Sequence, residues 1–212
     1  MPRLEIDSTP FDLDTPHGRA RAHVSEVSRP RAAMILGHGA GGGIAATDLV
    51  AARASALAQG LSVALVEQPY RVAGRRSPAP ARQLDAAWVA IVTALLADPF
   101  RRLEPIVGGR SAGARVACRT AEGVGALGVL CLAFPLRPPR RPGTPEAESR
   151  LAELEAVRVP MLVVQGSRDP FGIPPPAPIR MVSTVQGDHS LRSDGEGVGR
   201  AVSDWLRDLL RD

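Results

Sequence analysis

Lysine is absent from the sequence, and all 26 of its basic residues are arginines. The formal charge is nevertheless only +4, and aromatic residues make up only 3% of the 212 residues. Proteins that bind nucleic acids combine clustered basic residues with aromatic side chains on which bases stack. We therefore attribute the arginine bias to codon composition, and we expect no nucleic-acid partner.

Cysteine and long apolar runs are also scarce. The cysteines, Cys118 and Cys131, lie in apolar surroundings, which indicates free thiols of a reducing compartment and not a disulfide framework. No stretch is apolar over the length of a transmembrane helix, and the first residues, MPRLEIDSTPFDLD, lack the hydrophobic segment of a signal peptide. No cluster of metal ligands is visible in the sequence. These absences predict a cytoplasmic protein that needs neither a membrane nor a metal.

A linker is missing as well. No Ser/Gly-rich or charged segment divides the chain, and a hydrophobic content of 44% is sufficient for one complete core. The segment 136–145, LRPPRRPGTP, is rich in proline and arginine and is expected to form a loop or a small insertion. The sequence therefore predicts one domain over residues 1–212.

Short apolar runs alternate with amphipathic stretches along most of the chain. This pattern predicts an α/β fold with a mostly parallel sheet of about seven to eight strands and helices on both faces. Residues 3–27 alternate between apolar and polar side chains and predict an antiparallel hairpin with a turn at 14–18. His17 is expected in that turn and His23 on the polar face, both solvated.

The remaining elements follow from the same patterns. Strands are expected at 32–36, 62–66, 105–107, 124–134, 160–165 and 180–185, a loop at 71–80, and helices at 47–60, 84–95, 112–122, 145–157 and 198–209. The first of these helices begins at Thr47 or Asp48, either of which can cap it. Trp88 falls on the apolar stripe of its helix and is expected in the core. Only residues 135–159 separate the strand expected at 124–134 from the strand expected at 160–165, and one helix is expected among them. Any cap over the sheet is therefore expected to be minimal.

One apolar run stops at a serine that has a glycine two residues to either side. The segment Gly109-Arg110-Ser111-Ala112-Gly113 is a G-x-S-x-G pattern. In a nucleophile elbow this pattern lifts a serine hydroxyl out of a sheet on a strained strand-to-helix turn, and the glycines remove side chains that would collide. Ser111 is therefore predicted to be a nucleophile.

A second glycine-rich segment follows the strand predicted at 32–36, and it can be interpreted in two ways. Gly37, Gly39 and Gly42 satisfy the dinucleotide fingerprint G-x-G-x-x-G, with Glu67 where a ribose-binding acid would lie. The helix begins too far beyond Gly42 for that fingerprint, however, and a hairpin precedes the motif. We prefer an oxyanion loop, in which closely spaced glycines let a backbone N–H point at developing negative charge.

Two further strand ends carry the partners that a nucleophilic serine needs. Asp169 follows the strand predicted at 160–165, and His189 follows the last strand. The carboxyl ends of parallel strands gather at one edge of a sheet, so both residues are expected near Ser111. The order Ser, Asp, His is that of α/β-hydrolases and differs from the orders in other serine hydrolases.

Each of these partners has competitors elsewhere in the sequence. His38 is the other histidine expected at this edge, but it lies in the glycine loop, which it is expected to help hold. Asp188 and Glu67 could replace Asp169 as the acid. Asp188 adjoins His189, and neighbouring side chains usually point apart, which favours Asp169.

Taken together, these motifs resemble those of the small, lidless α/β-hydrolases related to dienelactone hydrolases. The resemblance rests on HGAGGG at 38–43, GGRSAGARVA at 108–117, QGSRDPFG at 165–172 and GDHSL at 187–191. It implies an α/β-hydrolase fold with a minimal or absent cap and the triad of Ser111, His189 and Asp169, but it does not define the substrate. The nucleophile is serine where dienelactone hydrolases have cysteine, so their particular chemistry is not implied.

The expected mechanism is attack of Ser111 on the carbonyl of a small acyl substrate, without a cofactor. The oxyanion is expected to accept hydrogen bonds from the N–H of Ala112 and from an N–H of the glycine loop, that of Ala40. The residues expected to support this loop are His38, Gly39 and Gly41.

Two alternatives concern substrate and function. Five arginines lie on or near the expected active edge and would favour an anionic substrate if they converged: Arg71, Arg75, Arg76, Arg110 and Arg168. Scattered surface arginines are the simpler interpretation. The fold could also serve as a non-catalytic interaction module, although no element of the catalytic set is missing from the sequence.

Overall fold

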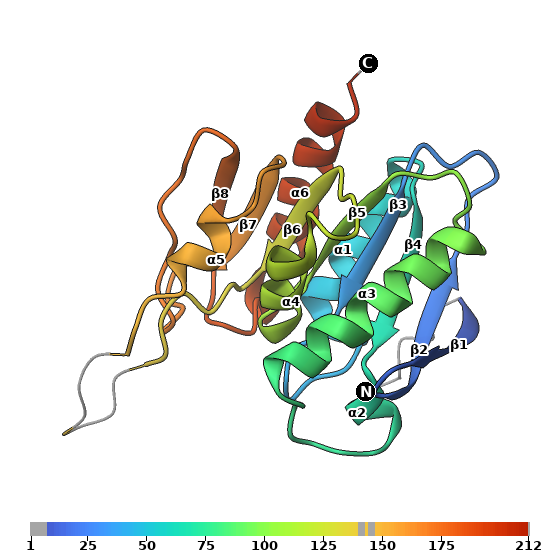
Figure 1. Ribbon diagram of the computed structural model, residues 1–212. Helices are drawn as coiled ribbons and strands as arrows, with labels where there is room; N and C mark the ends of the chain where they lie inside the picture. The colour runs from blue at the N-terminus through green and yellow to red at the C-terminus, as the bar shows by residue number, and fades with distance from the viewer. Residues whose placement is uncertain (1–7, 140–142, 144–146, 212) are drawn as a thin grey trace.

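A computed structural model describes residues 8–139, 143 and 147–211, and its centre is an eight-stranded sheet in the order β1-β2-β4-β3-β5-β6-β7-β8 (Figure 1). The strands are β1 (Thr9–Thr15), β2 (Gly18–Ser25), β3 (Ala33–Gly37), β4 (Ser62–Glu67), β5 (Pro105–Arg110), β6 (Gly128–Leu132), β7 (Met161–Gly166) and β8 (Arg180–Val185). β2 pairs antiparallel with β1 and β4, whereas β3 to β8 pair in parallel. The expected mostly parallel sheet with an N-terminal hairpin is confirmed.

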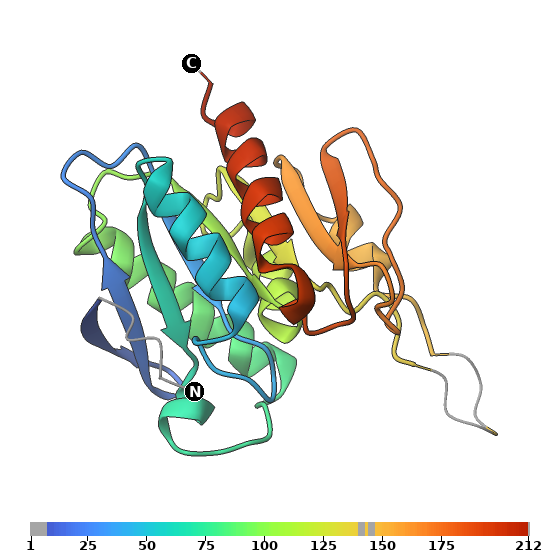
Figure 2. The same cartoon turned by 180° about the vertical axis from the view of Figure 1, so that it is seen from behind.

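Helices cover both faces of this sheet. They are α1 (Thr47–Ala58), α2 (Pro69–Val72), α3 (Ala81–Ala97), α4 (Ala112–Thr120), α5 (Leu151–Glu155) and α6 (Gly195–Leu209), with a short 3-10 helix η1 (Arg192–Asp194) before the last. Figure 1 shows α3, α4 and α5 on one face, and Figure 2 shows α1 and α6 side by side on the other. Strands covered on both faces need apolar side chains on both, which explains the continuous apolar runs of β3 to β7.

Each face of the sheet has its own hydrophobic core. Trp88 and Ile91 of α3 are buried in the core beneath α3 and α4, and Trp205 of α6 is buried in the core beneath α1 and α6. Burial of an aliphatic side chain such as Ile91 stabilises a fold by about 1.5–3 kcal/mol. The two cores therefore fix the sheet between the helices, and the expected position of Trp88 in the core is confirmed.

Several boundaries differ from the sequence prediction. The strand expected at 124–134 shortens to β6, because residues 121–125 form the turn after α4, closed by a bond from the N–H of Ala126 to the carbonyl of Ala121 (3.0 Å). The loop expected at 71–80 begins later, because its first two residues belong to α2, whose first residue, Pro69, suits the start of a helix.

The helix expected at 145–157 is also shorter. It is reduced to α5 within the described residues, and residues 144–146 lie outside them, as do 140–142 of the Pro/Arg-rich segment and residues 3–7 of the expected hairpin. The start of α1 is correct, but the predicted cap is wrong, since Ala46 is the N-cap residue and makes no side-chain cap bond. Asp48 is instead fully buried, and its carboxylate faces Arg110.

The loops that follow β3, β5, β7 and β8 meet at the carboxyl edge of the parallel strands. In the described part of the segment between β6 and β7, α5 is the only helix, so this part provides no lid over that edge. The minimal cap expected from the sequence is confirmed. Among the described residues, no helix has the length and apolar character needed to cross a bilayer.

Candidate active site

Ser111 occupies a strained turn between β5 and α4. Its backbone has φ 53° and ψ −108°, a conformation that a residue with a side chain rarely adopts. Gly109 and Gly113 make this turn possible, because a Cβ on Gly109 would collide with the carbonyl oxygen of Gly37, and one on Gly113 would lie 2.5 Å from the same oxygen. The G-x-S-x-G spacing therefore forms the elbow geometry for the physical reason that the sequence suggested.

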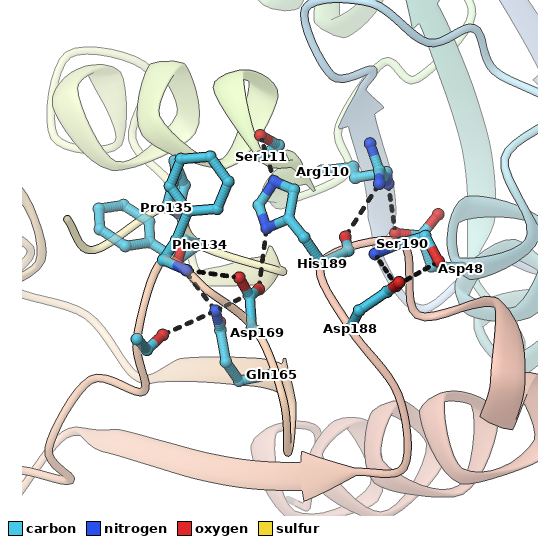
Figure 3. A network of polar contacts seen from close by, with 12 residues as sticks. Asp48, Arg110, Ser111, Phe134, Pro135, Gln165, Asp169, Asp188, His189 and Ser190 are labelled. Atoms are coloured by element: carbon cyan, nitrogen blue, oxygen red, sulfur yellow. Dashed lines mark hydrogen bonds and ion pairs between the residues drawn. The ribbon is translucent and has the colours of Figure 1, made fainter. Parts of the chain in front are cut away.

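The structure brings Ser111, His189 and Asp169 together as a hydrogen-bonded chain (Figure 3). The Oγ of Ser111 lies 2.9 Å from Nε2 of His189, and Nδ1 of His189 lies 2.8 Å from Oδ2 of Asp169. The Asp169 side chain is fully buried, whereas 21% of the His189 side chain is exposed. A general base needs this arrangement, in which a buried acid orients the ring and the opposite edge of the ring is accessible to a substrate.

Two further donors hold the Asp169 carboxylate. The N–H of Phe171 donates to Oδ1 (2.9 Å), and Nε2 of the fully buried Gln165 donates to Oδ2 (2.7 Å). The same Gln165 amide group lies within 3.1 Å of the carbonyl of Phe134 and 3.0 Å of that of Gly172. Gln165 was missed in the sequence, although a polar residue at the end of the apolar run MLVVQ is a usable signal.

The competing acids bond elsewhere. Asp188 is exposed and accepts from the N–H (2.8 Å) and the hydroxyl (2.6 Å) of Ser190, bonds that lower the pKa of Asp188. Glu67 lies 3.0 Å from Nε2 of His23, and that bond is the main reason that the pKa of Glu67 is lowered. His23 keeps 22% of its side chain exposed, so the solvated position expected for it holds only in part, because the pairing of β2 with β4 also brings it to Glu67. His17 is exposed, as expected.

His38 is buried and bonded at both ring nitrogens. Its Nδ1 donates to the carbonyl of Gly39 (2.8 Å), and its Nε2 accepts from the N–H of Gln68 (3.1 Å). Burial lowers the pKa of His38, so the ring is neutral in the tautomer that these two bonds require. With both nitrogens occupied, His38 has no free position from which to act as a base.

These bonds hold the glycine loop beside the nucleophile. A Cβ on Gly39 would lie 3.5 Å from the Cβ of Ser111, which places Gly39 against the serine. The carbonyl of Gly39 also accepts from the N–H of Gly42 (3.3 Å), and the carbonyl of Ala40 accepts from the hydroxyl of Tyr70 (3.0 Å). Because the peptide bond is planar and trans, fixing the Gly39 carbonyl also fixes the opposite direction of the Ala40 N–H.

The loop lacks the packing of a dinucleotide fingerprint. A Cβ on Gly41 or on Gly42 would meet no atom within 4 Å, so neither glycine is required for close packing of a helix on a strand. The helix α1 begins only at Thr47, five residues beyond Gly42, and Glu67 is engaged by His23. The space around Gly41 likewise gives no steric reason for a supporting role of that residue.

The arginines of the active edge do not converge on Ser111. Nε of Arg110 lies 2.9 Å from Oδ2 of Asp48, and its Nη2 donates to the carbonyl of His189 (2.9 Å). Arg71 donates to the carbonyl of Arg75 (3.5 Å), and the side chains at positions 75, 76 and 168 are exposed. The simpler interpretation of scattered arginines is therefore the one that the structure supports.

An open hollow borders the triad on the side of β6 and β7. It has a volume of about 470 Å³, and its lining includes Leu136, Phe171 and Ile173 together with Arg137. The ring of Phe171 lies 4.3 Å from that of His189 between centroids, tilted by 38°. Apolar surface is thus available directly beside the catalytic geometry. The described residues contain no group of three or more His, Cys, Asp or Glu side chains that could hold a metal ion.

The class of protein follows from this fold and site together with the sequence match. Residues 30–204 match the family model described as an alpha/beta hydrolase domain. This match covers most of the chain, and the chain belongs to the α/β-hydrolase family. No curated protein matches the sequence.

Solved structures agree with this assignment of the fold. The chain is similar to an α/β serine hydrolase homologue from Coxiella burnetii, with a TM-score of 0.75 and 13% identity over 95% of this chain and 98% of that one. A lidless α/β serine hydrolase from Xanthomonas campestris gives a TM-score of 0.73 and 15% identity, with 98% and 97% covered. A dienelactone hydrolase from Anabaena variabilis gives 0.72 and 14%, with 97% and 99% covered. The resemblance to small lidless members of the family is confirmed at the level of the fold.

Proposed function

We propose that the protein is a serine hydrolase that cleaves a carboxylic ester or a related acyl bond. The observation that carries this proposal is the hydrogen-bonded chain from Ser111 through His189 to Asp169 on a strained elbow. The names of several similar structures, which include serine hydrolases, support the same reaction class. No metal or cofactor has a part in this chemistry.

The reaction begins when Nε2 of His189 takes the proton of the Ser111 hydroxyl as its Oγ attacks the acyl carbon. The carbonyl π electrons move to the oxygen, and Asp169 stabilises the imidazolium that forms. His189 then returns the proton to the departing alkoxide, which leaves an acyl group on Ser111. A water molecule, deprotonated by His189, releases the acid and restores the hydroxyl.

Two backbone groups are suited to hold the negative oxygen. Ala112 is the first residue of α4, where the N–H groups of the first turn have no partner within the helix. The N–H of Ala40 is the second donor, and its direction is fixed by the bonds to the carbonyl of Gly39. Loss of one such donor typically reduces turnover by about 10²- to 10³-fold.

The surroundings of the triad suit an ester with a small apolar group. The hollow beside Phe171 has Leu136 and Ile173 in its lining, and Arg137 lines it as well. Arg110, the arginine closest in sequence to the serine, is engaged by Asp48. Comparing a carboxylated ester with a neutral ester of equal size tests whether Arg137 bears on the charge of the substrate.

Hydrolysis of p-nitrophenyl acetate and butyrate tests the proposal. Ser111→Ala removes the nucleophile and should lower turnover on the order of 10⁵- to 10⁶-fold. Ser167→Ala is the matched control, because Ser167 is an exposed serine in the loop after β7, and it should retain the activity of the unchanged protein. Equal rates for the Ser111→Ala variant and the unchanged protein would contradict the proposal.

A further inference from the structure

The side chain of Arg110 reaches two other parts of the site, the start of α1 and the loop of His189. It is the last residue of β5 and directly precedes Ser111. Its guanidinium contacts Asp48 at the start of α1 and the backbone carbonyl of His189 (Figure 3). One side chain thus joins the strand of the nucleophile to the loop of the base.

The anchor of this side chain is a carboxylate without access to solvent. Asp48 is fully buried, and its Oδ1 accepts from the N–H of Leu49 (2.9 Å). Its Oδ2 lies 2.9 Å from Nε of Arg110, with the N–H not aimed at the oxygen, so the contact is an ion pair and not a well-aligned hydrogen bond. A buried carboxylate needs a nearby positive charge, and Arg110 provides one.

The guanidinium also packs on the glycine loop. A Cβ on Gly39 would lie 2.9 Å from Nη1 of Arg110, so a side chain at position 39 would displace the guanidinium. Arginine suits this position because its planar fork presents donors in fixed directions, whereas a lysine has one nitrogen on a flexible stem. The guanidinium pairs with Asp48 through Nε and donates from Nη2 to the carbonyl of His189, while Nη1 lies beside Gly39.

The bond to His189 acts on the residue whose ring must meet Ser111. The ring is held by Asp169 at Nδ1, and the backbone of the same residue is held by Nη2 of Arg110 (2.9 Å). Fixing both ends of His189 fixes the direction in which Nε2 points. We propose that Arg110, held by Asp48, is a positioning residue that sets the base against the nucleophile; this inference rests on the proposed hydrolase function.

The rate at which a fluorophosphonate labels Ser111 measures this effect. The limiting rate at high reagent concentration depends on the alignment of His189 with Ser111, whereas the half-saturating concentration depends on reagent binding. Arg110→Lys keeps a positive charge near Asp48, but it replaces the two guanidinium nitrogens that contact Asp48 and the His189 carbonyl by one ammonium on a flexible stem. We expect its limiting rate to fall by roughly 10- to 100-fold, since small misplacements of catalytic groups have effects of this size, with the half-saturating concentration unchanged.

A double variant separates positioning from stability. Arg110→Met with Asp48→Leu replaces the buried ion pair by apolar side chains, so no unpaired charge is left behind. It should unfold near the temperature of the unchanged protein and still label as slowly as Arg110→Lys. Should the double variant not fold, the Arg110→Lys variant alone decides.

The matched control is a second ion pair away from the base. Arg115 and Glu153 form a bidentate pair between α4 and α5 with nitrogen to oxygen distances of 2.9 and 2.5 Å. Arg119 also lies 3.3 Å from Glu153, but it keeps its own bidentate partner, Asp85, when Glu153 is replaced. Arg115→Met with Glu153→Leu should keep the limiting rate of the unchanged protein. Unchanged limiting rates in both Arg110 variants, or an equal fall in the Arg115 control, would overturn the positioning role. Failure of the unchanged protein to label would instead contradict the hydrolase function itself.

Discussion

Two histidines lie at the same edge of the sheet, and their surroundings give them opposite properties. His38 bonds two backbone groups, those of Gly39 and Gln68, and only 3% of the residue is exposed. His189 bonds two side chains, Ser111 and Asp169, and 21% of its side chain is exposed. The comparison teaches that partners and exposure, and not a place at a strand end, distinguish the imidazole that holds a loop from the one that we propose as the base.

The acid behind His189 provides the largest test of this contrast. Asp169→Asn replaces the carboxylate that orients Nδ1 with an amide, and the wrong tautomer of the ring then faces Ser111. We expect turnover of p-nitrophenyl esters to fall by about 10⁴-fold with little change in fold. Steady-state hydrolysis measures the loss.

Asp188→Asn is the control for this change. Asp188 adjoins His189 in the chain but bonds Ser190, so its amide variant should keep full activity. A greater loss in Asp188→Asn than in Asp169→Asn would reverse the assignment of the acid.

The bond from His38 to Gly39 provides a smaller test. An asparagine at position 38 can place its amide nitrogen where Nδ1 lies and keep the donor to the Gly39 carbonyl, whereas a glutamine reaches the position of Nε2 and loses it. We expect His38→Gln to lower turnover by roughly 10²-fold, because the Ala40 N–H loses its fixed direction, and His38→Asn to lower it less. Equal losses in the two variants would show that the donor to Gly39 is unimportant.

The neutral state of His38 predicts a still smaller effect, on stability. Burial lowers the pKa of His38 below 6.5, so below pH 6.5 the unfolded chain takes up a proton that the folded chain does not. This contribution to stability is complete above pH 6.5 and is lost as the pH falls toward the folded-state pKa. Each pKa unit of lowering corresponds to about 1.4 kcal/mol.

Thermal unfolding between pH 5 and 8 measures this dependence. The difference in stability between the unchanged protein and His38→Gln should shrink as the pH falls below 6.5. His17→Gln is the control, because His17 is exposed in the hairpin turn. A difference that stays constant across this range would contradict a depressed pKa at His38.

Some of the contacts of these histidines could be predicted from the sequence, and others could not. Ser111, Asp169 and His189 each follow an apolar strand, and parallel strands gather their carboxyl ends, so local pattern was enough to bring them together. The pairing of His23 with Glu67 was missed, because it depends on which strands are neighbours in the sheet and on their register.

The support around the triad was harder to predict for the same physical reason. Gln165 lies near the end of β7 and donates to Asp169 in the loop that follows this strand. It could have been recognised in the sequence as a polar residue in an apolar run. Arg110 and Asp48 are far apart in sequence. They meet only because the fold packs the start of α1 against the end of β5. Asp48 instead suggested a helix cap, since aspartate at a helix start usually serves as one.

The most direct test of the central claim is to locate the residue that reacts with a fluorophosphonate. The unchanged protein and His189→Ala are exposed to the reagent, digested and examined by mass spectrometry. We predict a phosphonyl adduct on Ser111 in the unchanged protein and almost none in His189→Ala. An unlabelled Ser111 in folded protein, or labelling of Ser111 that does not need His189, would contradict an activated nucleophile at this site.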